Sequence, residues 1–532
     1  MRSTFMGLET ARRGMFTQQS ALYVTGHNIA NANTPGFSRQ RINFEQTSPY
    51  PAASMNRPQI PGQMGTGVEA GSVQRIREGF LDLQYRVEAN KVGYYNSMSE
   101  SLTKMEEIMN EPSESGLHAT MEKFWNSLQD IASHTENTGA RDVAAASGQM
   151  VADTLNYYYN SLSRVQQDIG SEIGVKVKEI NGLVSQINEL NKQIASVEPN
   201  GYLPNDLYDE RDLYVDQLSQ LVNIKVTNVK PDNYGHAKDI SEGLYKIEIV
   251  GDDGKSFSPP AVLLDVTKED GLKDPNLLEV IDTTDAANED LELISGVITE
   301  VRVGGAALPS MNFSGELSGL IKSYGYKDGA GNEAGFYPDM LQKLNDFTTA
   351  FAMEFNKIHE SGFDLSGNPG KAFFEFDQSQ GDNPAQQIRV NKDILADSSL
   401  IAAAATNTGG SGDNDNAHEL SQIKTKAFGS FLSKGDAGFP ASMTSGNLDT
   451  YYSGIIGRLG VDSQSAQKNA NNSIVLADSV DRSRQSVSAV SLDEEMTNMI
   501  KFQHAYNAAA RNITVVDEML DKIINGMGVV GR

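Results

Sequence analysis

The segment SLDEEMTNMIKFQHAYNAAARNITVVDEMLDKIIN, residues 491–525, carries the most regular apolar pattern in the chain and predicts one long helix. Ser491 and Glu494 fit a capping box at its start, in which each side chain satisfies a free backbone N–H of the first turn. Gly526 is the expected stop. The apolar residues recur every seven positions, the period of helices that pack along one another. This C-terminal seam consists of Leu492, Met499, Tyr506, Ile513 and Leu520.

The N-terminal region predicts a second helix, with a weaker seam of the same period. The companion positions Ala11 and Gln18 are small or polar, which weakens the apolar stripe. Thr34-Pro35-Gly36 ends the helix, because the proline ring disfavours helical geometry at the residue before it. This N-terminal seam consists of Leu8, Met15, Leu22 and Ile29.

Both extreme ends of the chain therefore carry apolar seams. Short heptad stripes are often core packing inside one domain, and that interpretation stays open for both seams. Soluble monomers, however, usually leave their ends polar and loose. Because a single helix cannot bury an apolar stripe alone, the two seams predict an interface with other subunits.

The interior of the chain alternates between long helices and one β-rich piece. Residues 45–72 are rich in Pro and Gly and predict an extended connector. Apolar periodicity predicts helices over about 77–109, 165–197 and 337–359. Residues 222–314 instead contain short β-branched runs, such as KIEIV and VITEVRVGG, between turn residues, which indicate strands.

The predicted fold class is α+β, mainly α, with long terminal coiled-coil helices and an α-rich core domain that carries an inserted β-rich outer domain. A chain of 532 residues is long enough for two to four such parts. We expect terminal helices from residues 1–65 and 488–532, an α-rich core from 66–221 and 315–487, and an acidic β-rich outer domain at 222–314.

Composition excludes several functional classes. The formal net charge of −26 argues against a nucleic-acid binder and against attraction to an anionic membrane. The chain has no cysteine, which excludes disulfides, thiolate-bound zinc and a thiol nucleophile. No apolar run approaches the ~18 residues of a membrane span. The first residues lack a basic segment followed by an apolar one, so no cleaved secretory signal is expected.

No motif predicts catalysis, a cofactor or a bound metal. The seven histidines are scattered, and none pairs at metal-ligand spacing. His359-Glu360 begins an HExxH pattern, but Phe363 stands where the second histidine should be. The glycine string that starts at Gly526 follows a predicted helix rather than a strand, unlike a dinucleotide-binding loop. The sequence therefore predicts a protein that is not an enzyme.

Several segments resemble the axial proteins of the bacterial flagellum. Residues 21–42, ALYVTGHNIANANTPGFSRQRI, are similar to the N-terminal signature of flagellar rod, hook and hook-associated proteins, and residues 491–525 are similar to their C-terminal helix. Three interior segments resemble the hook-associated protein 1 family in particular. These are LPNDLYDERDLYVDQLSQLVNIKV at 203–226, NKIHESGFDLSGNPGKAFFEF at 356–376 and GDNDNAHEL at 412–420.

The resemblance implies a structural subunit at the junction of hook and filament, outside the cell, exported by the flagellar type III apparatus without a cleaved signal peptide. It implies self-association into a helical ring whose inner tube is made by the terminal helices. The implied partners are the hook protein, hook-associated protein 3 and an export chaperone for the C-terminal helix, with no nucleic acid, membrane or cofactor. Two alternatives stay open. One is another axial subunit, such as hook-associated protein 3 or the hook protein, and the other is a flagellar scaffold whose residues 227–312 form an adhesin or ligand-binding domain.

Overall fold

The computed structural model of the chain describes residues 5–51, 54, 55, 57, 62–232, 234–267, 271–284, 294–309, 311–377, 383–407 and 412–526. Helices dominate and short strands form several small sheets, which confirms the predicted α+β, mainly α fold class. Parts of the connector predicted at 45–72, of the β-rich piece at 222–314 and of the glycine string that begins at Gly526 lie outside the described residues.

The chain forms two compact units. Unit 1 comprises the described residues of 1–89, 180–277 and 474–532, and unit 2 those of 90–179 and 278–473. Three long helices contribute residues to both units: α2 (Gly79–Met109), α4 (Thr138–Val197) and α11 (Leu448–Ser488). The strands expected to form one outer domain at 222–314 are divided between the two units. The expected division into three parts stays a prediction about which parts fold independently.

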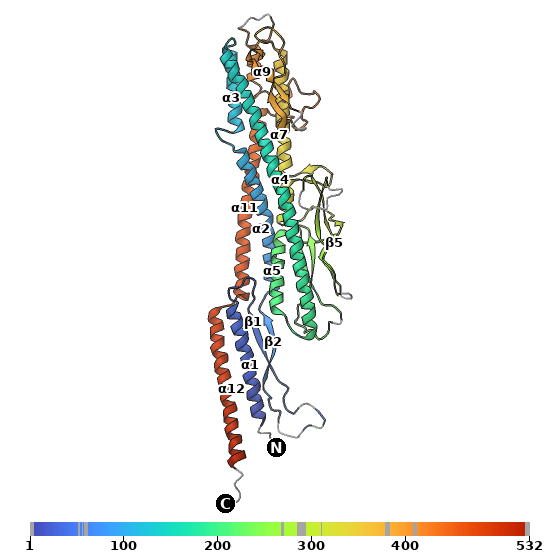
Figure 1. Ribbon diagram of the computed structural model, residues 1–532, viewed down its shortest axis with the longest axis vertical. Coiled ribbons are helices and arrows are strands. Elements are labelled where there is room, and N and C mark those ends of the chain that lie inside the picture. The colour runs from blue at the N-terminus through green and yellow to red at the C-terminus, as the bar shows by residue number, and fades with distance from the viewer. Residues whose placement is uncertain are drawn as a thin grey trace, which may run out of the picture. The chain divides into compact units, whose positions relative to one another are not determined.

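Unit 1 contains the two terminal helices, which lie side by side and run in opposite directions (Figure 1). Its other elements are a two-stranded ribbon, a helix and a three-stranded antiparallel sheet of order β3-β4-β5. The helices are α1 (Phe5–Ala30), α5 (Asn205–Leu221) and α12 (Leu492–Gly526), with a short 3₁₀ turn at Glu198–Asn200. The strands are β1 (Gln40–Gln46), β2 (Val68–Arg75), β3 (Ile224–Val229), β4 (Leu244–Val250), β5 (Ser256–Leu264), β6 (Val266–Thr267) and β7 (Gly271–Leu272).

The core of unit 1 lies where α4, α5 and the three-stranded sheet meet. Ile194 of α4, Tyr208 of α5 and Leu244 of β4 are buried together with Val266. The turn before β1 needs Gly36, whose φ of 81° lies in the left-handed region that glycine adopts without strain. The predicted helix stop at Thr34-Pro35-Gly36 is therefore a turn that directs the chain from α1 into β1.

Unit 2 is built around α7, whose apolar side chains recur at helical spacing as predicted. Phe124 of α3 meets Phe351 and Phe355 of α7, with ring centroids 6.3 and 5.4 Å apart. The helices of this unit are α3 (Leu117–Ser133), α6 (Glu316–Tyr324), α7 (Phe336–Ser361), α8 (Pro384–Gln387), α9 (Lys392–Ala396) and α10 (Asp415–Ser421), with 3₁₀ turns at Ser398–Leu400 and Phe428–Ser430. The strands are β8 (Leu278–Asp282), β9 (Ile298–Val303), β10 (Ala306–Ala307), β11 (Tyr326–Lys327), β12 (Glu333–Ala334), β13 (Phe374–Phe376) and β14 (Ile388–Val390).

Candidate functional site

The N-terminal seam lies on the side of α1 that faces α12. The opposite side of α1 is held by the β1–β2 ribbon, where the Oγ1–H of Thr17 donates to the carbonyl of Val68 over 3.1 Å. Asn28 exchanges two further hydrogen bonds with the backbone of Gln40, of 2.8 and 3.0 Å. At 3.6 residues per turn the seam lies well away from these contacts, and the helix that packs along α1 is α12. All four residues of the seam are half-buried: Leu8, Met15, Leu22 and Ile29.

The C-terminal seam faces α1 in the same way. Four of its residues, Met499, Tyr506, Ile513 and Leu520, are half-buried, whereas Leu492 at the start of α12 is 48% exposed. The structure thus brings the two predicted seams together within one chain. Because neither seam is fully buried by this pairing, both retain apolar surface at their margins. An interface between subunits at these residues stays a prediction.

A second apolar row lies on an outward face of α1. Phe5, Phe16 and Tyr23 are 60%, 52% and 78% exposed. Their spacings of 11 and 7 residues place all three within ~20° of one another around the helix axis. Sequence reasoning missed this aromatic row, although the seven-residue spacing of Phe16 and Tyr23 is a signal that a second stripe exists.

Arg39 ties the start of α12 to the segment that leaves α1. Its guanidinium lies 2.5 Å from the Glu494 carboxylate and 2.8 Å from the Glu495 carboxylate, and its backbone N–H donates to the carbonyl of Ser488. The predicted capping box is only half formed, since the N–H of Glu494 lies 3.5 Å from the Ser491 hydroxyl while the Glu494 carboxylate turns to Arg39. Arg39 therefore anchors the first turn of α12 to the segment that follows α1.

A network of buried charged side chains is centred on α5. Asp209, Asp212 and Asp216 occupy one face of that helix, at spacings of three and four residues. Three arginines face them. Arg75 lies 2.7 Å from Asp209 and 3.0 Å from Asp212, Arg77 lies 3.1 Å from Asp212, and Arg86 lies 3.1 Å from Asp212 and 2.7 Å from Asp216.

Proton affinities within this network follow from burial and from the arginines. Burial acts to raise the pKa of Asp212, but Arg77, Arg75 and Arg86 outweigh it and hold that pKa well below its usual range. Asp212 is therefore ionised at any pH near neutrality. Burial raises the pKa of Asp209, although Arg75 and the N–H of Ser38 oppose that effect. The aspartates of this network are paired with arginines and do not act as free acids or bases.

The same face of α5 also holds the chain that leads to and from the terminal helices. The N–H of Ser38 donates to Asp209 over 2.9 Å, and the Asn205 amide donates to the carbonyl of Val73 over 3.0 Å. Arg484, near the end of α11, lies 2.5 Å from Asp216. The N-terminal ribbon and the helix before α12 are thus fixed to one helix.

Arg211 extends the network toward the sheet of unit 1. Its side chain is fully buried, and its guanidinium lies over the rings of Tyr245 and Tyr208, with the charge 3.4 and 5.3 Å from the ring centroids. It donates to the Asn191 side chain and to the Gly243 carbonyl over 3.2 and 2.8 Å. Asp209, Arg211 and Asp212, which lie in segment 203–226, therefore have structural roles in this network.

The second recognisable segment, 356–376, organises the aromatic core of unit 2. Asn356 accepts hydrogen bonds from the N–H groups of Phe373 and Phe374, 2.9 and 2.8 Å long, and donates to the Phe374 carbonyl. One ring nitrogen of His359 lies 2.6 Å from the Lys371 carbonyl, and the other accepts from the N–H of Ala402 over 2.9 Å. Both ring nitrogens are occupied, so this buried histidine is structural. Burial lowers its pKa to about 4.

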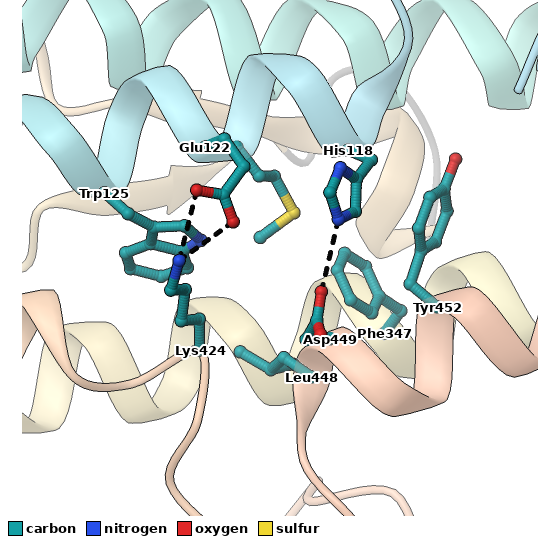
Figure 2. A pocket seen from close by; sticks show the side chains of 9 residues that line it. His118, Glu122, Trp125, Phe347, Lys424, Leu448, Asp449 and Tyr452 are labelled. Carbon is teal, nitrogen blue, oxygen red and sulfur yellow. Dashed lines mark hydrogen bonds and ion pairs between the residues drawn. The ribbon is translucent and has the colours of Figure 1, made fainter. Parts of the chain in front are cut away.

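A small pocket in unit 2 lies among α3, α7 and α11 (Figure 2). An ion pair and a histidine–carboxylate contact flank it: Lys424 lies 2.9 Å from Glu122, and the His118 ring lies 3.3 Å from Asp449. Its apolar lining consists of Met121, Trp125, Phe347, Leu448 and Tyr452. The polar groups at its rim pair with each other. Within the described ranges, no three histidine or acidic side chains lie where they could hold a metal ion, and no helix could cross a membrane.

Known proteins resemble this chain from end to end. The family model of the flagellar hook-associated protein FlgK helical domain matches residues 102–256 and 266–374. The flagella basal body rod protein family matches residues 8–37, and the flagellar basal body rod FlgEFG protein C-terminal family matches 483–526. These two terminal matches cover most of α1 and all of α12.

Three relatives illustrate the similarity. The flagellar hook-associated protein 1 of Bacillus subtilis is 45% identical over 537 residues, which cover 100% of both chains. The protein of that name from Escherichia coli is 22% identical over 97% of this chain and 99% of its own. The solved structure of the flagellar hook junction protein FlgK from Burkholderia pseudomallei has the same fold, with a TM-score of 0.54 at 16% identity over 77% of this chain and 100% of that one.

The 45% identity spans the whole chain, and the two terminal family matches fall on α1 and α12, the helices that pair in unit 1. The chain belongs to the flagellar hook-associated protein 1 family and is a structural component of the bacterial flagellum rather than an enzyme.

Proposed function

We propose that this chain joins the hook to the filament by forming a ring of identical subunits. The observation that carries the proposal is the aromatic row of Phe5, Phe16 and Tyr23 on the outward face of α1. Three large apolar side chains aligned in water are costly to leave exposed, and a neighbouring subunit would cover them. The Burkholderia pseudomallei protein of the same fold is a hook junction protein, which supports this assignment.

In this proposal the half-buried seams act together with the aromatic row. The α1–α12 pair would form the wall of the inner tube, and the margins of Leu8, Met15, Leu22 and Ile29 and of the C-terminal seam would contact adjacent subunits. The hook protein would lie on one side of the ring and hook-associated protein 3 on the other. An export chaperone would hold the C-terminal helix, whose apolar seam needs a cover before assembly.

The proposed role of the ring is mechanical rather than chemical. A hook bends and a filament is stiff, so the ring between them must hold its shape under load. The charge network of α5 supports such a role, because buried ion pairs with several hydrogen bonds resist rearrangement. The ribbon β1–β2, α5 and the end of α11 would move as one body.

Deletion of the gene tests the junction function. We expect cells with intact hooks and no filaments, seen by electron microscopy of negatively stained cells, with filament protein released into the medium. Filaments of normal length on the hooks of the deletion strain would overturn the proposal.

Complementation of that strain tests the aromatic row. A Tyr23→Asp chain should be exported but fail to restore filaments, because a carboxylate within a covered apolar row would be desolvated. The matched Tyr23→Phe chain keeps the ring and should restore them. Equal filament counts for the two variants would show that this row is not covered in the ring.

A further inference from the structure

Methionine is the only oxidisable sulfur residue of this protein, because the chain has 18 methionines and no cysteine. A peroxide must reach the thioether to oxidise it, so the exposure of each side chain decides how fast it reacts. Five methionines of the packed interior are at most 7% exposed: Met105, Met109, Met121, Met340 and Met443. Four others among the described residues expose about half of the side chain or more: Met55, Met150, Met496 and Met519.

Two of the exposed methionines lie on α12, each at the centre of an outward apolar triad. The first triad is near the start of the helix, is 48–56% exposed and consists of Leu492, Met496 and Ile500. The second is near its end, is 47–59% exposed and consists of Val515, Met519 and Ile523. Residues four apart are neighbours along one side of a helix. Each of the two thioethers is therefore open to solvent and is also part of an apolar surface.

Met499 shows that exposure differs from one methionine to the next within the same helix. It lies only three residues after Met496, but it belongs to the C-terminal seam and is half-buried against α1. The backbone around both residues is helical, so a difference in their reactivity would report side-chain exposure.

We propose that Met496 and Met519 are sites of oxidation by peroxide, at which sulfoxide formation weakens the contacts of α12 with an adjacent subunit. The O–O bond of hydrogen peroxide breaks, one oxygen forms an S–O bond with the methionine sulfur, and the other leaves as water. The sulfur loses two electrons and the peroxide gains them. The product side chain is polar, whereas the thioether is apolar, and its reversal needs a methionine sulfoxide reductase.

The effect on assembly rests on the proposed function, since it takes the outward side of α12 to lie against the next subunit of the ring. Burial of a thioether stabilises such a contact, whereas burial of a sulfoxide oxygen without a hydrogen-bond donor destabilises it. The core of the single chain is not involved, because neither side chain belongs to it. Met55 and Met150 lie outside α12, so their oxidation leaves this surface unchanged.

Peroxide treatment of the purified full chain tests the two sites. Tandem mass spectrometry measures the sulfoxide fraction at each methionine over time. Met496 and Met519 should be oxidised about tenfold faster than the buried Met121 and Met443, which react only after local opening of the fold. Met499 should react at an intermediate rate. Equal rates at the exposed and buried positions would overturn the assignment of the sites.

Paired variants in the deletion strain test the effect on assembly. Met496→Gln/Met519→Gln replaces both thioethers with polar side chains, as sulfoxide formation does, whereas Met496→Leu/Met519→Leu keeps the surface apolar. The glutamine pair should be secreted but should give about tenfold fewer filaments than the leucine pair. The matched control Met55→Gln/Met150→Gln adds the same polar groups outside α12 and should restore filaments fully.

The possible failures can be told apart. Equal filament counts for the secreted glutamine and leucine pairs would overturn the effect on assembly. The single variants Met496→Gln and Met519→Gln repeat the comparison if the double variant is not secreted. Filaments in the deletion strain itself would overturn the junction function, whereas the rates of oxidation in the purified chain do not depend on that function.

Discussion

Asp212 of α5 lies 3.0 Å from Arg75 of β2, although 137 residues separate the two in the sequence. Arg77 and Arg86 reach the same carboxylate, and its side chain is only 4% exposed. One ionised group thus neutralises part of the charge of three buried guanidinium groups. The attachment of the N-terminal ribbon to α5 depends on that carboxylate more than on any single apolar contact.

Replacing Asp212 with Asn should therefore destabilise unit 1 strongly. The amide cannot neutralise the arginines, and a buried ion pair broken on one side costs about 3–5 kcal/mol. Urea unfolding of the purified chain, followed by far-ultraviolet circular dichroism, measures the loss. The control is Asp253→Asn, which breaks an exposed pair with Lys255 and should leave the unfolding midpoint unchanged. Similar midpoints for both variants would mean that the network contributes little.

Lowering the pH should destabilise unit 2, because His359 takes up a proton more readily in the unfolded chain. Its folded pKa is lowered to about 4 by burial, against about 6.5 in an unfolded chain, so the unfolded state binds the proton first. The stability that the neutral His359 ring contributes to unit 2 is complete above pH 6.5 and is lost as the pH falls toward 4. This amounts to roughly 1 kcal/mol between pH 6 and 5, and about 3 kcal/mol in total.

Trp125, the single tryptophan of the chain, reports this effect locally because it packs in unit 2 against Phe351. Its fluorescence follows urea unfolding at each pH. His359→Gln should be less stable at pH 7, since the longer, flexible amide does not hold its donor and acceptor where the two ring nitrogens lie, but its stability should change less between pH 6 and 5. An unaltered pH dependence in that variant would assign the acid sensitivity to other groups.

Gly370 should tolerate no side chain. A Cβ at this position would lie 2.0 Å from the carbonyl oxygen of His359, and backbone cannot yield as a flexible side chain can. Gly370→Ala should lower the unfolding free energy of unit 2 by about 1–3 kcal/mol or more, as overpacking does. Gly457→Ala, in the open on α11, should instead stabilise by about 0.5–1 kcal/mol. If both substitutions changed the unfolding free energy in the same direction, the close approach at Gly370 would be contradicted.

Replacing Ile513 with Asp should prevent assembly of the ring. The side chain is half-buried against α1, and neighbouring subunits would complete its burial, which makes a charge there unfavourable. Asp517→Asn, on the exposed side of α12, should support motility. Secreted but unassembled Ile513→Asp protein in the culture medium would point to the tube interface, whereas its absence would point to export. Normal filaments in Ile513→Asp cells would show that the seam pairs only within one chain.

Local periodicity predicted α1, α2, α7 and α12, but it gave only residues 165–197 of α4, which begins at Thr138, and it missed α3 and α5. The seven-residue spacing from Leu492 onward predicted α12 almost to the residue, because a helix is specified by its own side chains. The same pattern could not show what covers the seam. Any apolar helix at the right distance would serve, so the pairing with α1 came from the structure alone.

The charge network could not be predicted in the same way. Asp209 and Asp212 lie in segment 203–226, which resembles the hook-associated protein 1 family, but nothing local to them indicates Arg75 or Arg86, since such pairs depend on how distant parts of the chain fold together. The strands of 222–314 show a related limit. β-branched runs indicate strands but not their partners, and the strands proved to be shared between two units.

The pairing of α1 with α12 has a consequence for the order of events during synthesis. The N-terminal helix leaves the ribosome first, yet the helix that covers it is made from the last residues of the chain. Contacts between such distant segments form slowly, because closing the long intervening loop costs entropy before the contacts can stabilise the chain. Throughout translation α1 therefore stays without its partner, and the pair can form only after the last residues have been made.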